Sequence, residues 1–311
     1  MWSYALRRFI AFIPVYIAVM AFITYVSWEH MNVVGAHVGP KDGPAEWAKK
    51  KKDFGLTGNV FVRNLKKLSK TIRFQFGVSL TKDRPVVDVL KDRVLVSLSL
   101  TLPALIISTM LGVFIGLLAA FYRGRVFDRF LMMSATVGMS VSFLVYIIVF
   151  QYLLAYKLKL FPVSGFGDTL SESVPYILLP VIIQVLVSMG YDSRFYRAVM
   201  VEESTRDYIT TAYAKGVSTR SVIFIHMLKN AMIPIITRFF ISLPFLFMGS
   251  FLLEMFFSIP GLGSTLINAL TGKTDPPLII GATAVLCTLY IVFLVLTDIM
   301  YAVFDPRVRL E

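Results

Sequence analysis

Long apolar runs alternate with short polar segments over most of the chain. Six runs reach the roughly 18 residues that mark a membrane-spanning helix, and they cover residues 9–27, 95–121, 130–156, 174–192, 232–257 and 278–303. Composition agrees with this pattern, because 57% of the residues are hydrophobic and only 16% are charged. The chain is therefore expected to be an all-α polytopic membrane protein with six transmembrane helices. No small-residue cleavage site follows the first run, so we interpret that run as a retained span.

Basic residues flank the predicted spans mainly on one side. The clusters on that side are Arg7 and Arg8; Arg123, Arg125 and Arg129; Arg194, Arg197, Arg206, Lys215, Arg220 and Lys229; and Arg307 and Arg309. Cytoplasmic loops of helical membrane proteins carry the excess of Lys and Arg, which predicts that both termini lie in the cytoplasm (N-in/C-in). Residues 28–94 run against this rule, with fourteen basic and seven acidic residues. Long loops cross the membrane largely regardless of charge, so the orientation is kept.

The spans divide the chain into three segments. Residues 1–27 form the N-terminus and first span, residues 28–94 an extracytoplasmic loop, and residues 95–311 the transmembrane core. The loop contains an apolar stripe at helical spacing, made by Phe61, Leu65, Leu68, Ile72 and Phe76. Basic residues fill the other faces of this helix. Its apolar face either packs on the spans or lies on anionic lipid, or else the helix receives an acidic partner; a nucleic-acid partner is not expected.

A polar island at residues 203–234 separates the fourth and fifth spans. Ser204 and Asp207 have the spacing of a capping box that starts a helix. Gly216 is the residue type expected just beyond a helix end, and Ser218 can cap a second helix. This elbow is either a cytoplasmic docking surface for a peripheral subunit or an ordinary helical loop.

Motifs for hydrolytic or nucleotide chemistry are absent from the sequence. There is no His-Glu-x-x-His and no Gly-x-Ser-x-Gly, and Gly272-Lys-Thr274 has Ile267 where a phosphate loop needs glycine. A transporter of this kind is ATP-driven only if a separate subunit brings the ATPase. Glu254 and Asp298 are ionisable residues inside spans, for which we expect structural pairing rather than ion coupling. Gly112 and Gly116 permit close approach of the second span to a neighbour.

The most specific sequence patterns lie in the elbow and near the last two spans. The elbow reads Asp207-Tyr-Ile-x-Thr-Ala-x-Ala-Lys-Gly216, followed by His226-x-Leu-Lys-Asn-Ala-x-Ile-Pro234. Glu254-Met-Phe-Phe-Ser-Ile-Pro-Gly-Leu-Gly263 and Asp298-Ile-Met-Tyr-Ala-Val-Phe-Asp-Pro-Arg307 come later. Over nearly its full length the chain resembles the permease subunit of ATP-binding-cassette importers of the dipeptide, oligopeptide and nickel type. The resemblance implies a type I importer permease that forms half of the pathway for peptides or peptide-like solutes.

The resemblance also implies the partners and the site residues. The expected partners are a second related permease in a heterodimer, two cytoplasmic ATPases that bind ATP and Mg²⁺, an extracytoplasmic solute-binding protein and membrane lipid. No cofactor or metal is expected on this chain, which is not expected to be an enzyme, and the implied location is the bacterial inner membrane. The residues expected to couple to the ATPase are Asp207, Tyr208, Ile209, Thr210, Thr211, Ala212, Lys215 and Gly216. The possible pathway or gate residues are Glu254, Pro260, Gly261 and Gly263.

The elbow departs from the broader family pattern at one position. The glutamate of that pattern falls at Thr210, so contact with the ATPase must be made by other means. Packing of Tyr208, Ile209 and Ala212 into a groove on the ATPase is one hypothesis. Nickel or another small solute, or less favourably an ion-coupled secondary transporter, remain alternatives for the function.

Overall fold

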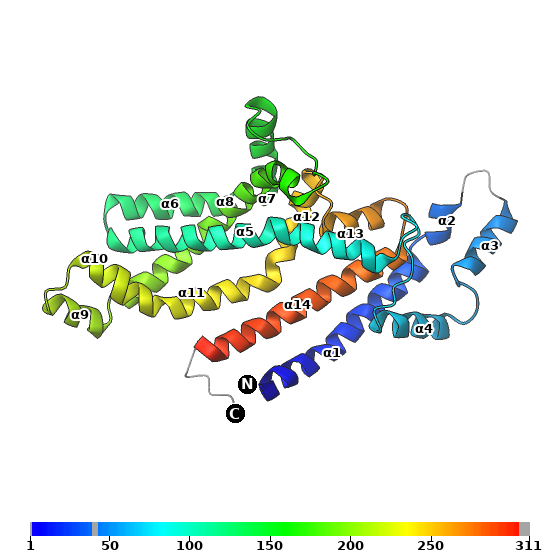
Figure 1. Ribbon diagram of the computed structural model, residues 1–311, viewed down its shortest axis with the longest axis horizontal. Helices are drawn as coiled ribbons and strands as arrows, with labels where there is room; N and C mark the ends of the chain where they lie inside the picture. Colours follow the sequence, from blue (N-terminus) through cyan, green and yellow to red (C-terminus); the bar gives the residue numbers. More distant parts are fainter. Residues whose placement is uncertain (1, 39–42, 305–311) are drawn as a thin grey trace. The chain divides into compact units, whose positions relative to one another are not determined.

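The computed structural model describes residues 2–38 and 43–304, so the predicted basic pair Arg307 and Arg309 lies outside the described residues (Figure 1). Apart from an isolated bridge between Val78 and Pro85, every regular element in the described part is a helix. The chain divides into two compact units. Unit 1 comprises Met1–Ser97 and Pro260–Val295, and unit 2 comprises Leu98–Ile259 and Leu296–Glu311.

Unit 1 contains the N-terminal helices and the helices near the C-terminus. They are α1 (Trp2–Tyr25), η1 (Val26–His30), α2 (Val33–His37), α3 (Pro44–Asp53), α4 (Val60–Ile72), the start of α5 (Val86–Phe121), α13 (Leu262–Thr271) and most of α14 (Pro276–Phe304). A methyl group on Gly281 would lie 2.5 Å from Cγ1 of Val86, so the start of α14 packs tightly on the start of α5.

Unit 2 contains the rest of α5 and the central helices. These are α6 (Val126–Ser140), α7 (Phe143–Phe150), η2 (Gln151–Lys157), α8 (Leu170–Glu203), α9 (Asp207–Ala214), α10 (Thr219–Ser221), η3 (Val222–Met227), α11 (Leu228–Ser242), η4 (Leu243–Phe245) and α12 (Leu246–Phe256). Helices α6 and α8 lie side by side (Figure 1).

The predicted all-α membrane fold is confirmed. Among the described residues, five helices are long and apolar enough to cross a membrane, and a bent pair of helices brings the number to six if it counts as one span. The N-in/C-in orientation and the three-segment division stay predictions.

The predicted third span, residues 130–156, is wrong as a continuous helix. Helix α6 ends at Ser140, and the helix that begins at Phe143 is bent from it by 94°. Three hydroxyls along α6 donate to the carbonyl four residues earlier: Ser134 to Phe130, Thr136 to Met132 and Ser140 to Thr136. Such back-bonding competes with helical hydrogen bonds and favours bending. The extended backbone of Val141 then completes the break.

The predicted bounds of the spans on either side of the elbow are also wrong. The fourth span continues as α8 to Glu203, well beyond residue 192. The fifth begins at Thr219 and ends at Phe245, rather than covering residues 232–257. Pro244 stands in the short 3₁₀ turn η4, where a proline that cannot continue the α-helix separates α11 from α12.

The predicted helix is confirmed as α4, but it ends at Ile72, so Phe76 of the predicted stripe lies beyond it and is buried. Within α4, the faces are turned differently from a helix whose apolar stripe packs on the spans. Phe61 is 74% exposed and Leu65 is 58% exposed. The basic face instead meets the end of the first span: Arg63 forms an ion pair with Glu29, and the Lys67 ammonium lies 3.2 Å from the ring centroid of Trp28. This orientation leaves the lipid and partner interpretations of the apolar stripe open.

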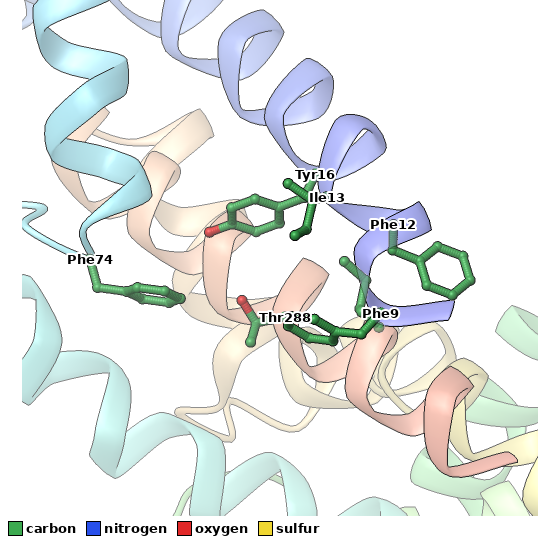
Figure 2. Close-up of a pocket in the computed structure, with 7 residues that line it drawn as sticks. Phe9, Phe12, Ile13, Tyr16, Phe74 and Thr288 are labelled. Carbon is green, nitrogen blue, oxygen red and sulfur yellow. The ribbon is translucent and has the colours of Figure 1, made fainter. Parts of the chain in front are cut away.

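An apolar pocket opens between α1 and α14 in unit 1. Phe9, Phe12, Ile13 and Tyr16 line it from α1, and Thr288 lines it from α14 (Figure 2). Phe74 closes one end, from a left-handed backbone conformation with φ of 57°. The first span is therefore not sealed against α14 along its whole length.

Candidate functional site

Helix α9 of the elbow begins two residues later than the capping pattern predicts, with its N-cap at Arg206 rather than Ser204. Ser204 does not cap α9, because its Oγ donates to the carbonyl of Val201 at 2.6 Å. The N-cap position is Arg206, and the first helical residue is Asp207. Ser204 therefore satisfies the carbonyl end of α8 rather than the amide end of α9, so the predicted capping box is wrong.

Gly216 ends α9 in the predicted way. Its φ is 77°, in the left-handed region that costs other residues about 1–2 kcal/mol. The Val217 amide donates to the Ala212 carbonyl at 3.2 Å, and the Gly216 amide donates to the Tyr213 carbonyl at 2.9 Å. This pair of hydrogen bonds is the Schellman arrangement, which satisfies carbonyls that a helix end otherwise leaves without donors.

Ser218 then starts the returning helix. Its side chain accepts a hydrogen bond from the amide of Ser221, as the sequence predicts. The chain continues through α10 and the π-helical turn η3 into α11 without leaving helical geometry. The elbow is thus a short helix, a glycine turn and the first turns of a membrane span.

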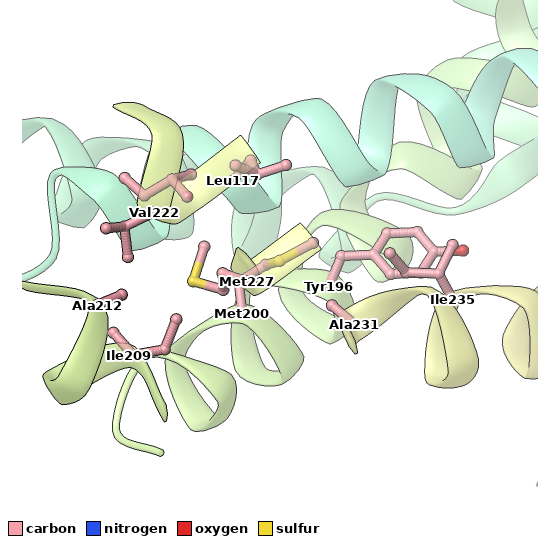
Figure 3. Packing of buried hydrophobic residues seen from close by; sticks show 10 residues of the cluster. Leu117, Tyr196, Met200, Ile209, Ala212, Val222, Met227, Ala231 and Ile235 are labelled. Atoms are coloured by element: carbon pink, nitrogen blue, oxygen red, sulfur yellow. The ribbon is translucent and has the colours of Figure 1, made fainter. Parts of the chain in front are cut away.

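An apolar cluster anchors the elbow to the spans (Figure 3). Ile209 and Ala212 of α9 are 3% and 7% exposed, and they pack with Met200 of α8, Leu117 of α5 and Met227 of η3. The cluster extends along α8 and α11 through Tyr196, Ala231 and Ile235. Displacement of α9 would therefore displace side chains of three spanning helices, namely α5, α8 and the span formed by η3 and α11.

This packing contradicts the hypothesis that Ile209 and Ala212 insert into a groove on a partner. Both side chains are already buried by their own chain. Because their apolar surface is already removed from water, insertion into a partner would gain no further burial energy from them. The residues of the predicted coupling set that remain exposed are Asp207, Thr210, Thr211, Lys215 and Gly216, together with the neighbouring Tyr213 and Ala214. The surface available to a partner is consequently polar, with one tyrosine.

Tyr208 joins the elbow to the end of α8. Its hydroxyl donates to Oε2 of Glu203 at 2.6 Å. Burial, and then this hydrogen bond, raise the pKa of the Tyr208 phenol above its usual value. Arg206 also pairs with Glu202 at 2.9 Å, but both side chains are mostly exposed, so that pair stabilises the turn weakly.

An ion pair that sequence reasoning missed braces α8 next to the elbow. The Arg197 guanidinium makes two hydrogen bonds to Asp128, at 2.6 and 2.7 Å, and Oδ2 of Asp128 also accepts from the amide of Gly124. The Asp128 side chain is 4% exposed. The available signal was one acid among the arginines of the turn between α5 and α6, but its partner lies in a distant span.

Helices α5 and α8 approach closely at the predicted glycine pair. A methyl group on Gly112 would lie 2.8 Å from Cβ of Asp192, and one on Gly116 would lie 2.8 Å from the backbone nitrogen of Arg197. No side chain larger than hydrogen fits between the two helices at these positions, which confirms the expected close packing.

A polar cavity of about 180 Å³ lies beside this contact, among α5, α8 and α11. Asp192 of α8 and Arg238 of α11 pair across it at 3.8 Å. Gln184, Ser188 and Ser242 add polar groups to its wall. The sequence alone does not indicate this pair, because the pairing depends on the packing of two separate helices.

The predicted pathway or gate residues fall in different units. Glu254 lies in α12 of unit 2, fully buried, and its carbonyl accepts from the amide of Ile259 at 2.8 Å. Pro260, Gly261 and Gly263 belong to unit 1, where the Pro260 carbonyl accepts from Nη1 of Arg93 at 2.9 Å. Their roles stay predictions. Among the described residues, no group of three or more His, Cys, Asp or Glu side chains could hold a metal ion.

Comparison with known proteins matches most of the chain to one family. The family model described as binding-protein-dependent transport system inner membrane component matches residues 112–310, which include the elbow. A dipeptide transport system permease protein of Lactococcus lactis is 36% identical over 237 residues, covering 76% of each chain. A probable peptide ABC transporter permease of Sinorhizobium fredii is 30% identical over 313 residues, covering 99% of this chain and 100% of the relative. A dipeptide transport system permease protein of Bacillus subtilis is 31% identical over 316 residues, covering 100% of this chain and 99% of the relative.

Proposed function

Because this chain belongs to the family of binding-protein-dependent transport system inner membrane components, we propose that it forms half of the translocation pathway of an ATP-driven importer for peptides or peptide-like solutes. The observation that carries the proposal is the elbow, a polar helix held on the ends of three spans by a buried apolar cluster. Relatives named as dipeptide or peptide permeases support the solute class.

The family sets the general setting of the chain. Its members are inner-membrane components of importers, and this chain is a multi-pass protein of the inner membrane. An importer of this family works with a binding protein and with ATPases on separate subunits. Within that setting we propose a heterodimer with a second related permease, and two cytoplasmic ATPases that carry ATP and Mg²⁺.

The division of the elbow into exposed and buried faces supports a mechanism for coupling. Thr210, Thr211 and Lys215 are exposed and contact the ATPase surface. Ile209 and Ala212 are buried against α8, α5 and η3, so movement of α9 displaces the helices on which it packs. Gly216 keeps the two arms of the elbow at a defined angle, and Tyr208 and Asp207 hold the start of α9.

We propose that the solute contacts the polar cavity of unit 2 on its way through the pathway. Charged side chains inside a membrane protein are costly unless they are paired or line a polar space. Asp192 and Arg238 satisfy both conditions, because they pair with each other and border the cavity. Glu254, Pro260, Gly261 and Gly263 are proposed to act nearer the gate.

Reconstitution tests the proposed function. The chain is placed in proteoliposomes with a second related permease, ATPase subunits and a solute-binding protein, and uptake of a labelled peptide is measured with and without ATP. We expect uptake only with ATP, and no hydrolysis by this chain alone. Uptake driven by an ion gradient without ATP, uptake of Ni²⁺ instead of peptide, or robust hydrolysis by the isolated chain would contradict the proposal.

A substitution on the exposed elbow face tests the coupling role. Thr210 is exposed, so the larger side chain of Thr210→Trp does not disturb packing within the chain and obstructs only a bound partner. We expect peptide uptake to fall by about tenfold, with insertion of the chain unchanged. Ser69→Trp puts the same ring on an exposed position of α4 and serves as the matched control. Equal uptake by both variants would remove Thr210 from the coupling surface.

A further inference from the structure

A second polar pocket lies in unit 1. It is bounded by the loop that precedes α5, the start of α5, α13 and the start of α14, and its volume is about 310 Å³. On the N-in orientation that the basic clusters predict, these helix ends face the outside of the cell. Ligand pockets range from about 300 to 1,000 Å³, so this one fits a small group rather than a whole peptide.

The pocket has a strongly cationic wall. Among the described residues that line it, Lys82, Arg93 and Lys273 are basic and none is acidic. Ser264, Thr265 and Asn268 supply neutral polar groups. Three positive charges around one small space repel each other, and an anion placed among them relieves that repulsion.

Arg93 is held in place with donor capacity to spare. Its Nη1 donates to the Pro260 carbonyl at 2.9 Å, which fixes the guanidinium against the start of α13. Its Nε is buried, and no acceptor in the described part of the chain reaches it. A guanidinium presents its N–H groups as a planar fork that matches the two oxygens of a carboxylate, so a donor left without a partner at this position points to a bound oxyanion.

Asp275, the acid beside the pocket, already accepts hydrogen bonds from its own chain. Asp275 is fully buried, and its Oδ2 accepts hydrogen bonds from Ser79 Oγ at 2.6 Å, from the Thr81 amide at 3.0 Å and from Thr81 Oγ1 at 2.8 Å. Its Oδ1 accepts from the amide of Leu278 at 3.1 Å. Asp275 therefore fixes the loop that carries Lys82. Burial, and then repulsion by Arg93, lower the pKa of Lys82 even though Asp275 acts in the opposite direction.

We propose that this pocket binds an oxyanion, the free C-terminal carboxylate of a peptide, between Arg93, Lys82 and Lys273. The inference rests on the proposed function, because it takes a peptide as the solute. Beyond that function, the inference states that the C-terminal carboxylate of the peptide is recognised, and that Arg93, Lys82 and Lys273 recognise it. A carboxylate occupies the buried end beside Arg93, and the two exposed lysines close over it from the rim.

Peptide binding to the full chain tests this inference without transport. The chain is placed in phosphatidylcholine nanodiscs without the binding protein, and fluorescence anisotropy measures the affinity of a labelled tripeptide with a free or an amidated C-terminus. We expect the free carboxylate to bind about tenfold more tightly, since a charge-assisted pair is lost on amidation. Lys82→Gln and Lys273→Gln should each remove most of this difference. Lys91→Gln, an exposed lysine of α5 outside the pocket, should leave it unchanged.

The outcomes separate this inference from the proposed function. Equal affinity for the free and amidated peptides, or equal effects of Lys91→Gln and Lys273→Gln, would overturn the carboxylate site while leaving ATP-dependent peptide uptake intact. Addition of phosphatidylglycerol to the nanodiscs identifies the other source of an oxyanion. If the anionic lipid abolishes the preference for the free carboxylate, the pocket holds a lipid phosphate, and the inference is overturned. Arg93→Lys, which keeps the charge and loses the fork, should weaken the free peptide more than the amidated one.

Discussion

The elbow region of unit 2 and residues 28–94 of unit 1 both gather basic side chains, but the two regions differ in how those charges are paired. Beside the elbow, Arg197 is matched by Asp128 through two hydrogen bonds. In unit 1, Lys67 and Lys82 each lie near another cation, and their pKa values are lowered. Residues 28–94 also pair Arg63 with Glu29, but they carry fourteen basic residues against seven acidic ones, so half of their positive charge has no matching acid.

The difference separates structural from binding roles. A matched, buried pair contributes geometry, because breaking it leaves a charge without a partner. A surplus of cations around a space contributes attraction for an anion, at some cost to the stability of the free protein. Substitutions at the elbow should therefore lower stability or coupling, whereas substitutions at Lys67 and Lys82 should alter pH dependence and binding, respectively.

The largest expected effect comes from breaking the matched pair. Asp128→Asn removes the carboxylate that Arg197 and the Gly124 amide share, and we expect the free energy of unfolding to fall by about 2 kcal/mol, below the full cost of a buried pair because Arg197 is partly exposed. Thermal or denaturant unfolding of the purified chain measures the change. Glu202→Gln, at the exposed pair with Arg206, should cost less than about 0.5 kcal/mol. Equal losses in the two variants would mean that the Asp128 pair is no more structural than a surface pair.

A smaller effect is expected at the glycine turn. Nothing lies within 4 Å of a methyl group built on Gly216, so a substitution there is opposed by its backbone conformation and not by crowding. Gly216→Val should cost about 1–2 kcal/mol locally and lower the amount of ATPase that copurifies with the chain. Gly216→Asn, which tolerates the left-handed conformation, is the matched control. Wild-type ATPase association by the valine variant would show that the elbow angle does not control docking.

The smallest effect is a pH dependence of stability that arises at Lys67 of α4. Burial, and then the neighbouring Arg63, lower the pKa of Lys67 to about 7 from 10.5. Between these two values the folded state binds fewer protons at this site than the unfolded state, so stability rises as the pH rises from about 7 toward 10.5. Unfolding followed through tryptophan fluorescence, to which Trp28 contributes, should show this slope in the wild type, and Lys67→Met should flatten it. A slope that survives the substitution would assign the titration to another group.

Features that depend on a few neighbouring residues were predictable from sequence. The apolar runs, the turn at Gly216 and the cap at Ser218 each follow from local chemistry. Some local signals still competed: Ser204 has the right spacing for an N-cap, yet its hydroxyl bonds back to Val201. The break after Ser140 lies inside one apolar run. The residues that favour it are Ser134, Thr136 and Ser140, whose back-bonding is seen only in the structure.

Features that depend on distant partners were not predictable. Asp128 and Arg197, or Asp192 and Arg238, are recognisable as pairs only once two helices are packed together. The same holds for α4, where the ion pair with Glu29 and the Trp28 contact turn the basic face inward. A hydrophobic stripe shows that a helix has two faces, but its neighbours decide which face is covered.

The glycine contact between α5 and α8 has a mechanical consequence. At Gly116 the backbone of α5 meets the backbone of α8 at Arg197, so no flexible side chain absorbs a displacement there, and the two helices are stiff toward each other at that point. A push on α9 enters α8 through Met200 and α5 through Leu117. We therefore expect α5 and α8 to move together under such a push, and to carry the Asp192 side of the cavity with them.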